Sequence, residues 1–524
     1  MNNNVGLLLL ILIPALGAGV CALWPKRNED FAKYFALAAS LLTLFVGVLL
    51  AGQFDWKGGN ELTWGFSQSN PFYLDSIGFG LKLGADAISM WLVLLTVLLQ
   101  PLAILASFQS IKDRTKEYYG WMLALLAVMN GVFVARDLLL FYVFFELTLV
   151  PMFFLIGIWG GPQRREAAAK FFLFTFSGSV FLLAGIIFLG LHSPKGFDLN
   201  EAVSFAQSMS PNGSYVRWWL LLAFLAGFAV KVPLFPVHTW LPLAHTEAPT
   251  AGSVILAGVL LKLGTYGLLK LAVPIASPDA VATFAPFVGA LCVIGVIYGA
   301  LVAWVQQDIK KLVAYSSVSH LGFCVLGLFA LNVIGVQGSV MYMINHGIST
   351  GALFLCVGMV YDRYHTRDIN QLSGLARKMP IWAFFMILFT LASIGLPGTN
   401  GFVSEFLTVL GAFTSKHLGI AYGSFAALGI ILGAVYMLHM AARVVWGPLK
   451  TPGEHDDHHQ AEQSGELPAD LNAREISILV PLALAVIILG WFPNIVLKTI
   501  QKPAQTIVQS IPAPRNQAVA TAAR

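Results

Sequence analysis

Apolar stretches of about 20 residues recur along the whole chain and constrain its fold more than any other feature. About fourteen of them lie near 5–24, 33–52, 84–108, 118–135, 138–160, 168–191, 217–240, 249–272, 281–303, 311–332, 336–360, 380–412, 420–446 and 476–499. A helix of about 20 apolar residues crosses the ~30 Å hydrocarbon core of a membrane. The pattern therefore predicts an all-α polytopic membrane protein with about 14 transmembrane helices, embedded in a lipid bilayer.

The composition excludes several classes of soluble protein. Apolar residues make up 57% of the 524 residues and charged residues 11%, and the mean hydropathy is +0.76. Soluble proteins carry roughly 25% charged residues. The Lys and Arg residues are scattered through short loops, so the net charge of +5 does not indicate nucleic-acid binding. A soluble enzyme, a nucleic-acid binder and a disordered scaffold are therefore excluded.

The sequence contains no pattern for a redox cofactor. The four cysteines, at positions 21, 292, 324 and 356, form no C-x-x-C motif and no zinc-type spacing with histidine. We also find no haem or flavin signature. The stretch Gly453–His459 contains three histidines, but a solvated loop within the polar segment 448–475 is favoured over a metal site. We expect no cofactor or metal in this chain.

The distribution of basic residues predicts the orientation of the spans. The loops that follow the odd-numbered spans carry most of the Lys and Arg residues. Such loops usually remain on the cytoplasmic side. With an even number of spans, both termini are then periplasmic, in a bacterial inner membrane. Residues 5–24 are expected to be a first span, because no basic segment precedes them and no cleavage motif follows.

Two helix-breaking motifs suggest an internal repeat. Lys231-Val-Pro-Leu-Phe-Pro236 interrupts predicted span 7, and Gly395-Leu-Pro-Gly398 interrupts predicted span 12. A repeat of five spans places its second copy upside down, as in many transporters with broken helices. We predict four regions: 1–110 with helices 1–3 and a polar loop, 111–275 and 276–447 as two inverted five-helix repeats, and 448–524 with a polar loop, helix 14 and a tail.

Four ionisable residues lie inside predicted spans: Glu146, Lys231, Lys262 and Glu405. Each charge there costs about 2.5–3.5 kcal/mol on insertion scales, and such residues usually line a transport pathway. A nearby carboxylate changes how readily a desolvated lysine releases its proton. Glu146 and Lys231 are therefore a candidate switchable pair, Lys262 is the next proton acceptor, and Glu405 is the terminal group.

Histidines and hydroxyl groups occur near these charges. The candidate proton relays are His238, His245, His320 and His346. Ser316, His320 and Cys324 share one helix face, as do Tyr342, His346, Ser349 and Thr350. Each polar face alone is typical of helix–helix contacts. Because both accompany the buried charges, they favour a hydrogen-bonded water chain.

These motifs together resemble the proton-translocating, antiporter-like membrane subunits of respiratory complex I. The resemblance rests on Glu146 before Pro151, the segment 231–245, Glu247-Ala-Pro-Thr250, Lys262-Leu-Gly, the segment 308–320 and Gly395–Gly398, which occur in the family's order. It covers about residues 84–446 and implies fourteen core helices with broken spans 7 and 12. Glu405 makes the chain most similar to the M-type subunits, because the L-type and N-type relatives carry Lys there.

The resemblance implies a subunit of an NADH:quinone oxidoreductase, a translocase that exports protons during quinone reduction. NADH, FMN, iron–sulfur clusters and quinone would be bound by partner subunits. The expected partners are L-type and N-type antiporter-like subunits and small membrane subunits. Two alternatives stay open, namely a subunit of a multi-subunit sodium/proton antiporter and a subunit of a membrane-bound hydrogenase complex. A purely structural membrane scaffold would tolerate neutralisation of the four charges.

Overall fold

The computed structural model of the chain describes residues 4–23, 25, 30–57, 61–65, 73–74, 78–209, 214–452, 470–509 and 511. The histidines at 455–459, considered above for a metal site, lie outside the described residues. Within the described part, twelve helical segments are long and apolar enough to cross a membrane. The all-helical, polytopic fold predicted from the apolar stretches is therefore confirmed.

The N-terminal part runs from α1 to α13. Its helices are α1 (Val5–Leu23), α2 (Phe31–Gln53), α3 (Ala87–Ala106), α4 (Thr115–Val134), α5 (Leu138–Leu147), α6 (Leu149–Trp159), α7 (Arg164–His192), α8 (Leu199–Ser208), α9 (Ser214–Lys231), α10 (Trp240–Glu247), α11 (Thr250–Ile255), α12 (Leu261–Gly267) and α13 (Val273–Ile275). The π-helical segments η3 (Leu256–Leu260) and η4 (Leu268–Ala272) join α11, α12 and α13 into one span.

The C-terminal part runs from α14 to α21. Its helices are α14 (Pro278–Trp304), α15 (Ile309–Phe329), α16 (Val333–Tyr364), the short 3₁₀ turn η5 (Leu375–Arg377), α17 (Pro380–Ser393), α18 (Asn400–Thr414), α19 (Ile420–Val444), α20 (Ala473–Trp491) and α21 (Asn494–Gln509).

Both spans that contain helix-breaking motifs are divided in the structure. Helix α9 ends at Lys231, and α10 begins only at Trp240. Helix α17 ends at Ser393, and α18 begins at Asn400. Between α17 and α18, Gly395 and Gly398 adopt φ angles of +70° and +92°, which favour glycine. Neither divided segment is among the twelve that are long and apolar enough to cross a membrane. A total of fourteen spans requires that both of them cross as well, and it stays a prediction.

Three features differ from the expected helices. The polar loop before α3 forms two small antiparallel sheets, in which β1 (Leu62–Trp64) pairs with β4 (Leu83–Ala85) and β2 (Tyr73–Leu74) with β3 (Phe79–Gly80). The last span ends at Trp491 instead of 499, because Pro493 interrupts the helix and the amphipathic α21 follows. The short helix α8 lies in a loop where no element was expected.

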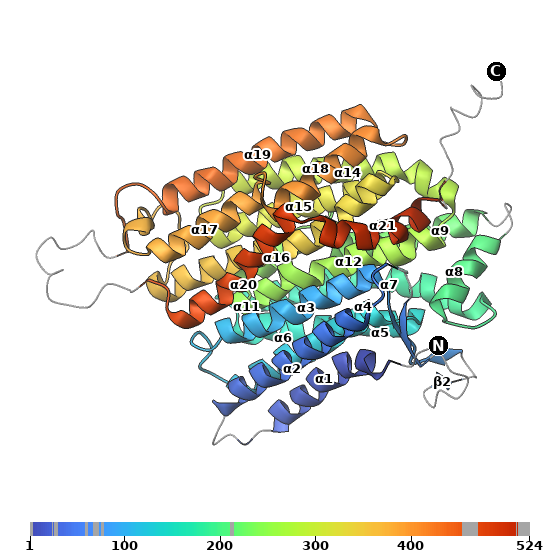
Figure 1. Cartoon of the computed structure of the whole chain (residues 1–524), viewed down its shortest axis with the longest axis horizontal. Coiled ribbons are helices and arrows are strands. Elements are labelled where there is room, and N and C mark those ends of the chain that lie inside the picture. Colours follow the sequence, from blue (N-terminus) through green and yellow to red (C-terminus); the bar gives the residue numbers. More distant parts are fainter. Residues whose placement is uncertain are drawn as a thin grey trace, which may run out of the picture.

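The long helices lie side by side in a flattened bundle, with α1 and α2 at one edge and α19 at the other (Figure 1). The most hydrophobic windows of α15, α16 and the α11–α13 span are at least 94% buried, whereas those of α1, α2, α7, α19 and α20 are at most 39% buried. The central helices are therefore shielded from lipid by the peripheral ones. Lys262, His320 and His346 all lie on these central helices.

Candidate functional site: a buried polar row

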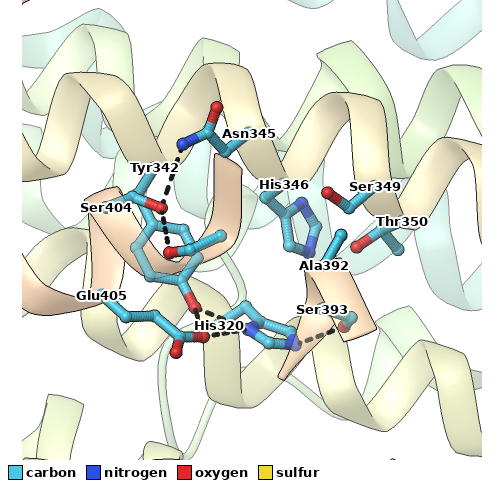
Figure 2. Close-up of a pocket in the computed structure, with 11 residues that line it drawn as sticks. His320, Tyr342, Asn345, His346, Ser349, Thr350, Ala392, Ser393, Ser404 and Glu405 are labelled. Atoms are coloured by element: carbon cyan, nitrogen blue, oxygen red, sulfur yellow. Dashed lines mark hydrogen bonds and ion pairs between the residues drawn. The ribbon is translucent and has the colours of Figure 1, made fainter. Parts of the chain in front are cut away.

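Glu405 is joined to the centre of the bundle by a tyrosine and a histidine (Figure 2). The Tyr342 hydroxyl donates to Glu405 Oε1 at 3.1 Å, and it lies 2.6 Å from Nδ1 of His320. On the opposite side of the ring, His320 Nε2 lies 3.3 Å from Ser393 Oγ. Helices α15, α16, α17 and α18 thus contribute one side chain each to a continuous hydrogen-bonded cluster.

A small cavity of about 10 Å³ lies beside this cluster. Its lining includes His320, His346, Ser349 and Glu405, and Figure 2 shows their side chains gathered around it. Nε2 of His346 is buried and has no hydrogen-bond partner among the described residues. A polar cavity of this size can hold about one water molecule. Such a water would bridge His346 and His320, whose ring centroids are 5.6 Å apart.

Lys262 extends this cluster toward the N-terminal half of the chain. Lys262, His346, His320, Tyr342 and Glu405 together are called the buried row. The Lys262 Nζ lies 2.7 Å from Nδ1 of His346 and also donates to the carbonyl of Ala257. Ala257 belongs to the π-helical segment η3. A π-helical turn departs from the regular α-helical pairing and occurs frequently at functional sites. The ammonium group, which is 0% exposed, is therefore held between a backbone carbonyl and an imidazole.

Lys231 lies at the end of the first half-helix, α9. Its Nζ donates to Thr148 Oγ1 at 3.0 Å and lies 4.8 Å from the ring centroid of Phe145. Thr148 is at the junction of α5 and α6, three residues before Pro151, which has no backbone N–H. The α5–α6 segment therefore supplies a hydrogen-bond acceptor to Lys231 at the end of α9.

Glu146 and Lys231, the predicted pair, lie within electrostatic reach of each other but are not bonded in this conformation. The two side chains form no ion pair, and Glu146 Oε1 is buried without a hydrogen-bond partner among the described residues. The structure therefore places both residues near the α5–α6 junction but does not join them.

The two remaining candidate histidines occupy different surroundings. His238 lies in the break after α9, against Phe235 and Tyr298. His245, on α10, is 0% exposed and stacks on Phe354 with ring centroids 4.8 Å apart. Neither ring nitrogen of His245 has a hydrogen-bond partner among the described residues. Neither histidine is hydrogen-bonded to Lys231 or Lys262.

Three contributors to the site were not identified from the sequence. Thr148 holds Lys231, Ser393 holds His320, and Asn400 accepts from Ser349 and so fixes the start of α18. Hydroxyl and amide residues are common in membrane helices as packing contacts. The position of Ser393 and Asn400 at the α17–α18 break is the one signal that could have singled them out.

A charged cluster lies at the start of α3, where Asp86 and Arg136 are outside the membrane-spanning segments and Lys270 comes from η4. The Asp86 carboxylate accepts from the Lys270 ammonium and lies 3.9 Å from Arg136. Burial raises the pKa of the Asp86 carboxyl, but the Lys270 and Arg136 cations outweigh this effect and hold it well below its usual range. This cluster ties the loop before α5 to α3 and η4.

Comparisons with known proteins assign the described architecture to a family. Residues 135–440 match the family described as NADH:quinone oxidoreductase/Mrp antiporter, TM, and residues 62–135 match NADH-ubiquinone oxidoreductase chain 4, amino terminus. The chain is 41% identical to NADH-quinone oxidoreductase subunit M of Rhodobacter capsulatus, with 96% of each chain covered. It is 40% identical to NADH-ubiquinone oxidoreductase chain 4 of Marchantia polymorpha, covering 95% of this chain and 96% of that one.

Solved structures show the same fold. A chain of respiratory complex I from Thermus thermophilus with bound NADH superposes with a TM-score of 0.83 at 28% identity, covering 97% of this chain and 100% of that one. A chain of the Mrp complex from Dietzia sp. superposes with a TM-score of 0.82 at 20% identity, covering 96% and 98%. The second likeness concerns the fold alone.

Proposed function

The chain belongs to the NADH:quinone oxidoreductase/Mrp antiporter family of membrane subunits, and from this premise we propose that it is a proton-translocating, M-type subunit of an NADH:quinone oxidoreductase. The observation that carries the proposal is the buried row from Lys262 through His346, His320 and Tyr342 to Glu405. Every member can accept and donate a proton, and the row crosses the best-shielded helices of the bundle.

Proton movement along the row needs only short transfers. A charged Lys262 donates its proton to His346 Nδ1, and His346 passes a proton from Nε2 through the cavity to His320. The Tyr342 hydroxyl then relays between His320 and Glu405, accepting on one side and donating on the other. Energy released by quinone reduction in partner subunits would drive the row between its two protonation states.

Glu146 and Lys231 would set the direction of this movement. A carboxylate that approaches a buried lysine stabilises its charged form, and withdrawal favours proton release. The hydrogen bond from Lys231 to Thr148, with no direct bond to Glu146, supports one of these two states. The approach and withdrawal of these side chains would take place at the broken segments, because residues 232–239 and 394–399 lie outside the helices.

The remaining features of the proposal follow the family. NADH, FMN, iron–sulfur clusters and quinone would be bound by other subunits, and this chain would contact L-type and N-type antiporter-like subunits and small membrane subunits. The two five-helix sets, 111–275 and 276–447, would be inverted repeats, which is supported by the place of the break in the fourth span of each set. Both termini would face the periplasm of a bacterial inner membrane.

A sodium/proton antiporter subunit is the second candidate, because the Mrp chain shares the fold. The identities of about 40% to complex I relatives favour the redox-coupled assignment. The single acids along the row also provide no cluster of carboxylates and carbonyls typical of hard cation sites.

The proposal is tested with the purified complex that contains this chain, reconstituted in vesicles. NADH addition should reduce quinone and build a pH gradient, while tracer sodium should not move independently. NADH-dependent sodium uptake that persists with a protonophore present would assign sodium as the transported ion.

A further inference from the structure

Lys310 is a buried cation that the row described above does not use. It lies in the first turn of α15, where the helix dipole disfavours a positive charge, and it is 6% exposed, whereas the adjacent Lys311 is exposed. Its Nζ donates to the carbonyl of Ala248, the only hydrogen-bond acceptor it has among the described residues. An ammonium group has three donors, so two remain for water.

On its outer side, Lys310 lies beneath a layer of charged side chains. Arg367 pairs with Asp308 at 3.3 Å and donates to the carbonyl of Thr246. The Arg367 and Asp308 side chains are 23% and 27% exposed. Glu247 accepts from the backbone N–H of Gln163 and acts electrostatically on Lys310. Lys310 is therefore one layer below the surface at the end of the bundle formed by these loops.

On the side of α10, Lys310 binds the carbonyl of Ala248, which comes about one turn after His245 on the same helix. The charges of Lys310 and Lys262 both act on the His245 ring. Both nitrogens of this ring are buried without a partner among the described residues, so each is available to a water molecule. His245 thus lies within electrostatic reach of both the lysine below the surface and Lys262, the first member of the buried row.

We propose that Lys310 and His245 form the proton uptake route from the surface at Asp308 and Glu247 to Lys262. The Lys310 ammonium releases a proton through water to the unprotonated nitrogen of His245. His245 releases the proton on its other nitrogen to the neutral Lys262 amine, and the Lys310 amine regains a proton from solvent water. This route rests on the proposed function, and by the predicted orientation it opens to the cytoplasm.

A purely structural role for Lys310 makes a different prediction. The Ala248 carbonyl is at the end of α10, and a cation there stabilises a helix terminus whether or not it exchanges protons. Arginine preserves the charge and the donor but cannot be deprotonated in a protein. Lys310→Arg therefore separates the two roles, and Lys310→Gln removes both.

The experiment measures proton export per NADH oxidised and the thermal unfolding midpoint of the assembled complex in vesicles. We expect Lys310→Arg to keep the unfolding midpoint but to lower proton export about tenfold or more. Lys311→Arg is the matched control and should leave both unchanged. Full proton export by the Lys310→Arg variant would overturn the route, and this result is decisive even if Lys310→Gln fails to assemble.

Lys262→Ala, measured in parallel, separates this inference from the proposed function. If Lys262→Ala abolishes proton export while Lys310→Arg retains it, only the uptake route is wrong. If Lys262→Ala retains full proton export, the proposed function itself is wrong.

Discussion

At the scale of single residues, Glu405 is the acid on which the buried row ends. It is 5% exposed, it accepts from Tyr342, and it lies in the second turn of α18 just after the α17–α18 break. Either a carboxyl group or a lysine can carry one proton per cycle at this place. Substitutions at Glu405 therefore show whether this residue acts by carrying a proton or by its negative charge.

We expect Glu405→Gln to block proton export, because the amide keeps the size of the side chain but does not titrate. Glu405→Asp should retain part of the activity, limited by its shorter reach to the Tyr342 hydroxyl. Glu405→Lys should retain more activity than Glu405→Gln when proton export is measured per assembled complex. Equal loss in the Lys and Gln variants would show that the negative charge itself is required.

The Tyr342 hydroxyl is hydrogen-bonded to both His320 and Glu405, whose Nδ1 and Oε1 atoms lie 3.9 Å apart. Tyr342→Phe removes it and leaves the ring, so proton export should fall about tenfold or more while assembly is maintained. Tyr119→Phe is the matched control, since Tyr119 is also 0% exposed and its hydroxyl has no partner among the described residues. Unchanged export in Tyr342→Phe would exclude the tyrosine from the relay.

At the scale of elements, proline and glycine made the two broken spans predictable. The segments Pro233–Pro236 and Gly395–Gly398 remove donors or adopt conformations that helices exclude. The π-helical segments beside Lys262 were not predictable, because Leu256–Leu260 and Leu268–Ala272 contain no proline or other residue that would indicate a π-helical turn. Their pairing is set by packing against neighbouring helices, which local sequence does not record.

The junction of α5, α6 and α9 supports a test of the switch. Glu146→Gln and Lys231→Ala should each strongly reduce proton export, and quinone reduction should fall with it because the two processes are coupled. Thr148→Val removes the hydrogen-bond acceptor of Lys231, so it should also alter proton export. Thr175→Val is the control, because the Thr175 hydroxyl bonds only within its own helix. The switch is ruled out if all three variants at the junction export protons normally.

At the scale of the whole molecule, the fold class and the family were predictable from the sequence, but the connections within the site were only partly so. Apolar length predicted the spans, and residue type predicted that Lys262, His320, His346 and Glu405 belong to one pathway. The sequence could not show that Tyr342 hydrogen-bonds to two of them or that Lys231 bonds to Thr148 and not to Glu146. Those facts depend on the relative rotation of helices that are far apart in the chain.

The Asp86 cluster links the start of α3 to η4, and it predicts a pH dependence of stability. Asp86→Asn keeps a side-chain oxygen that caps α3 by accepting from the Ser89 N–H, but it removes the charge. The free energy of unfolding should therefore fall by about 2 kcal/mol at pH 7. The pKa of the Asp86 carboxyl is lowered in the folded protein. Its contribution to stability is therefore complete above its pKa in the unfolded chain, about 4, and declines as the pH falls below that value. Thermal unfolding of both proteins should therefore converge as the pH falls below about 4, and a constant difference would contradict this assignment.

The most direct test of the central claim is the number of protons exported per NADH oxidised by vesicles that contain Lys262→Ala or Lys262→Arg. Lys262 is fully buried at the head of the row, and arginine can hold its charge but cannot pass a proton on. The account predicts that both variants assemble and that both lose most of their proton export. Full export by Lys262→Arg would show that only a fixed positive charge is needed and would contradict a proton pathway through Lys262.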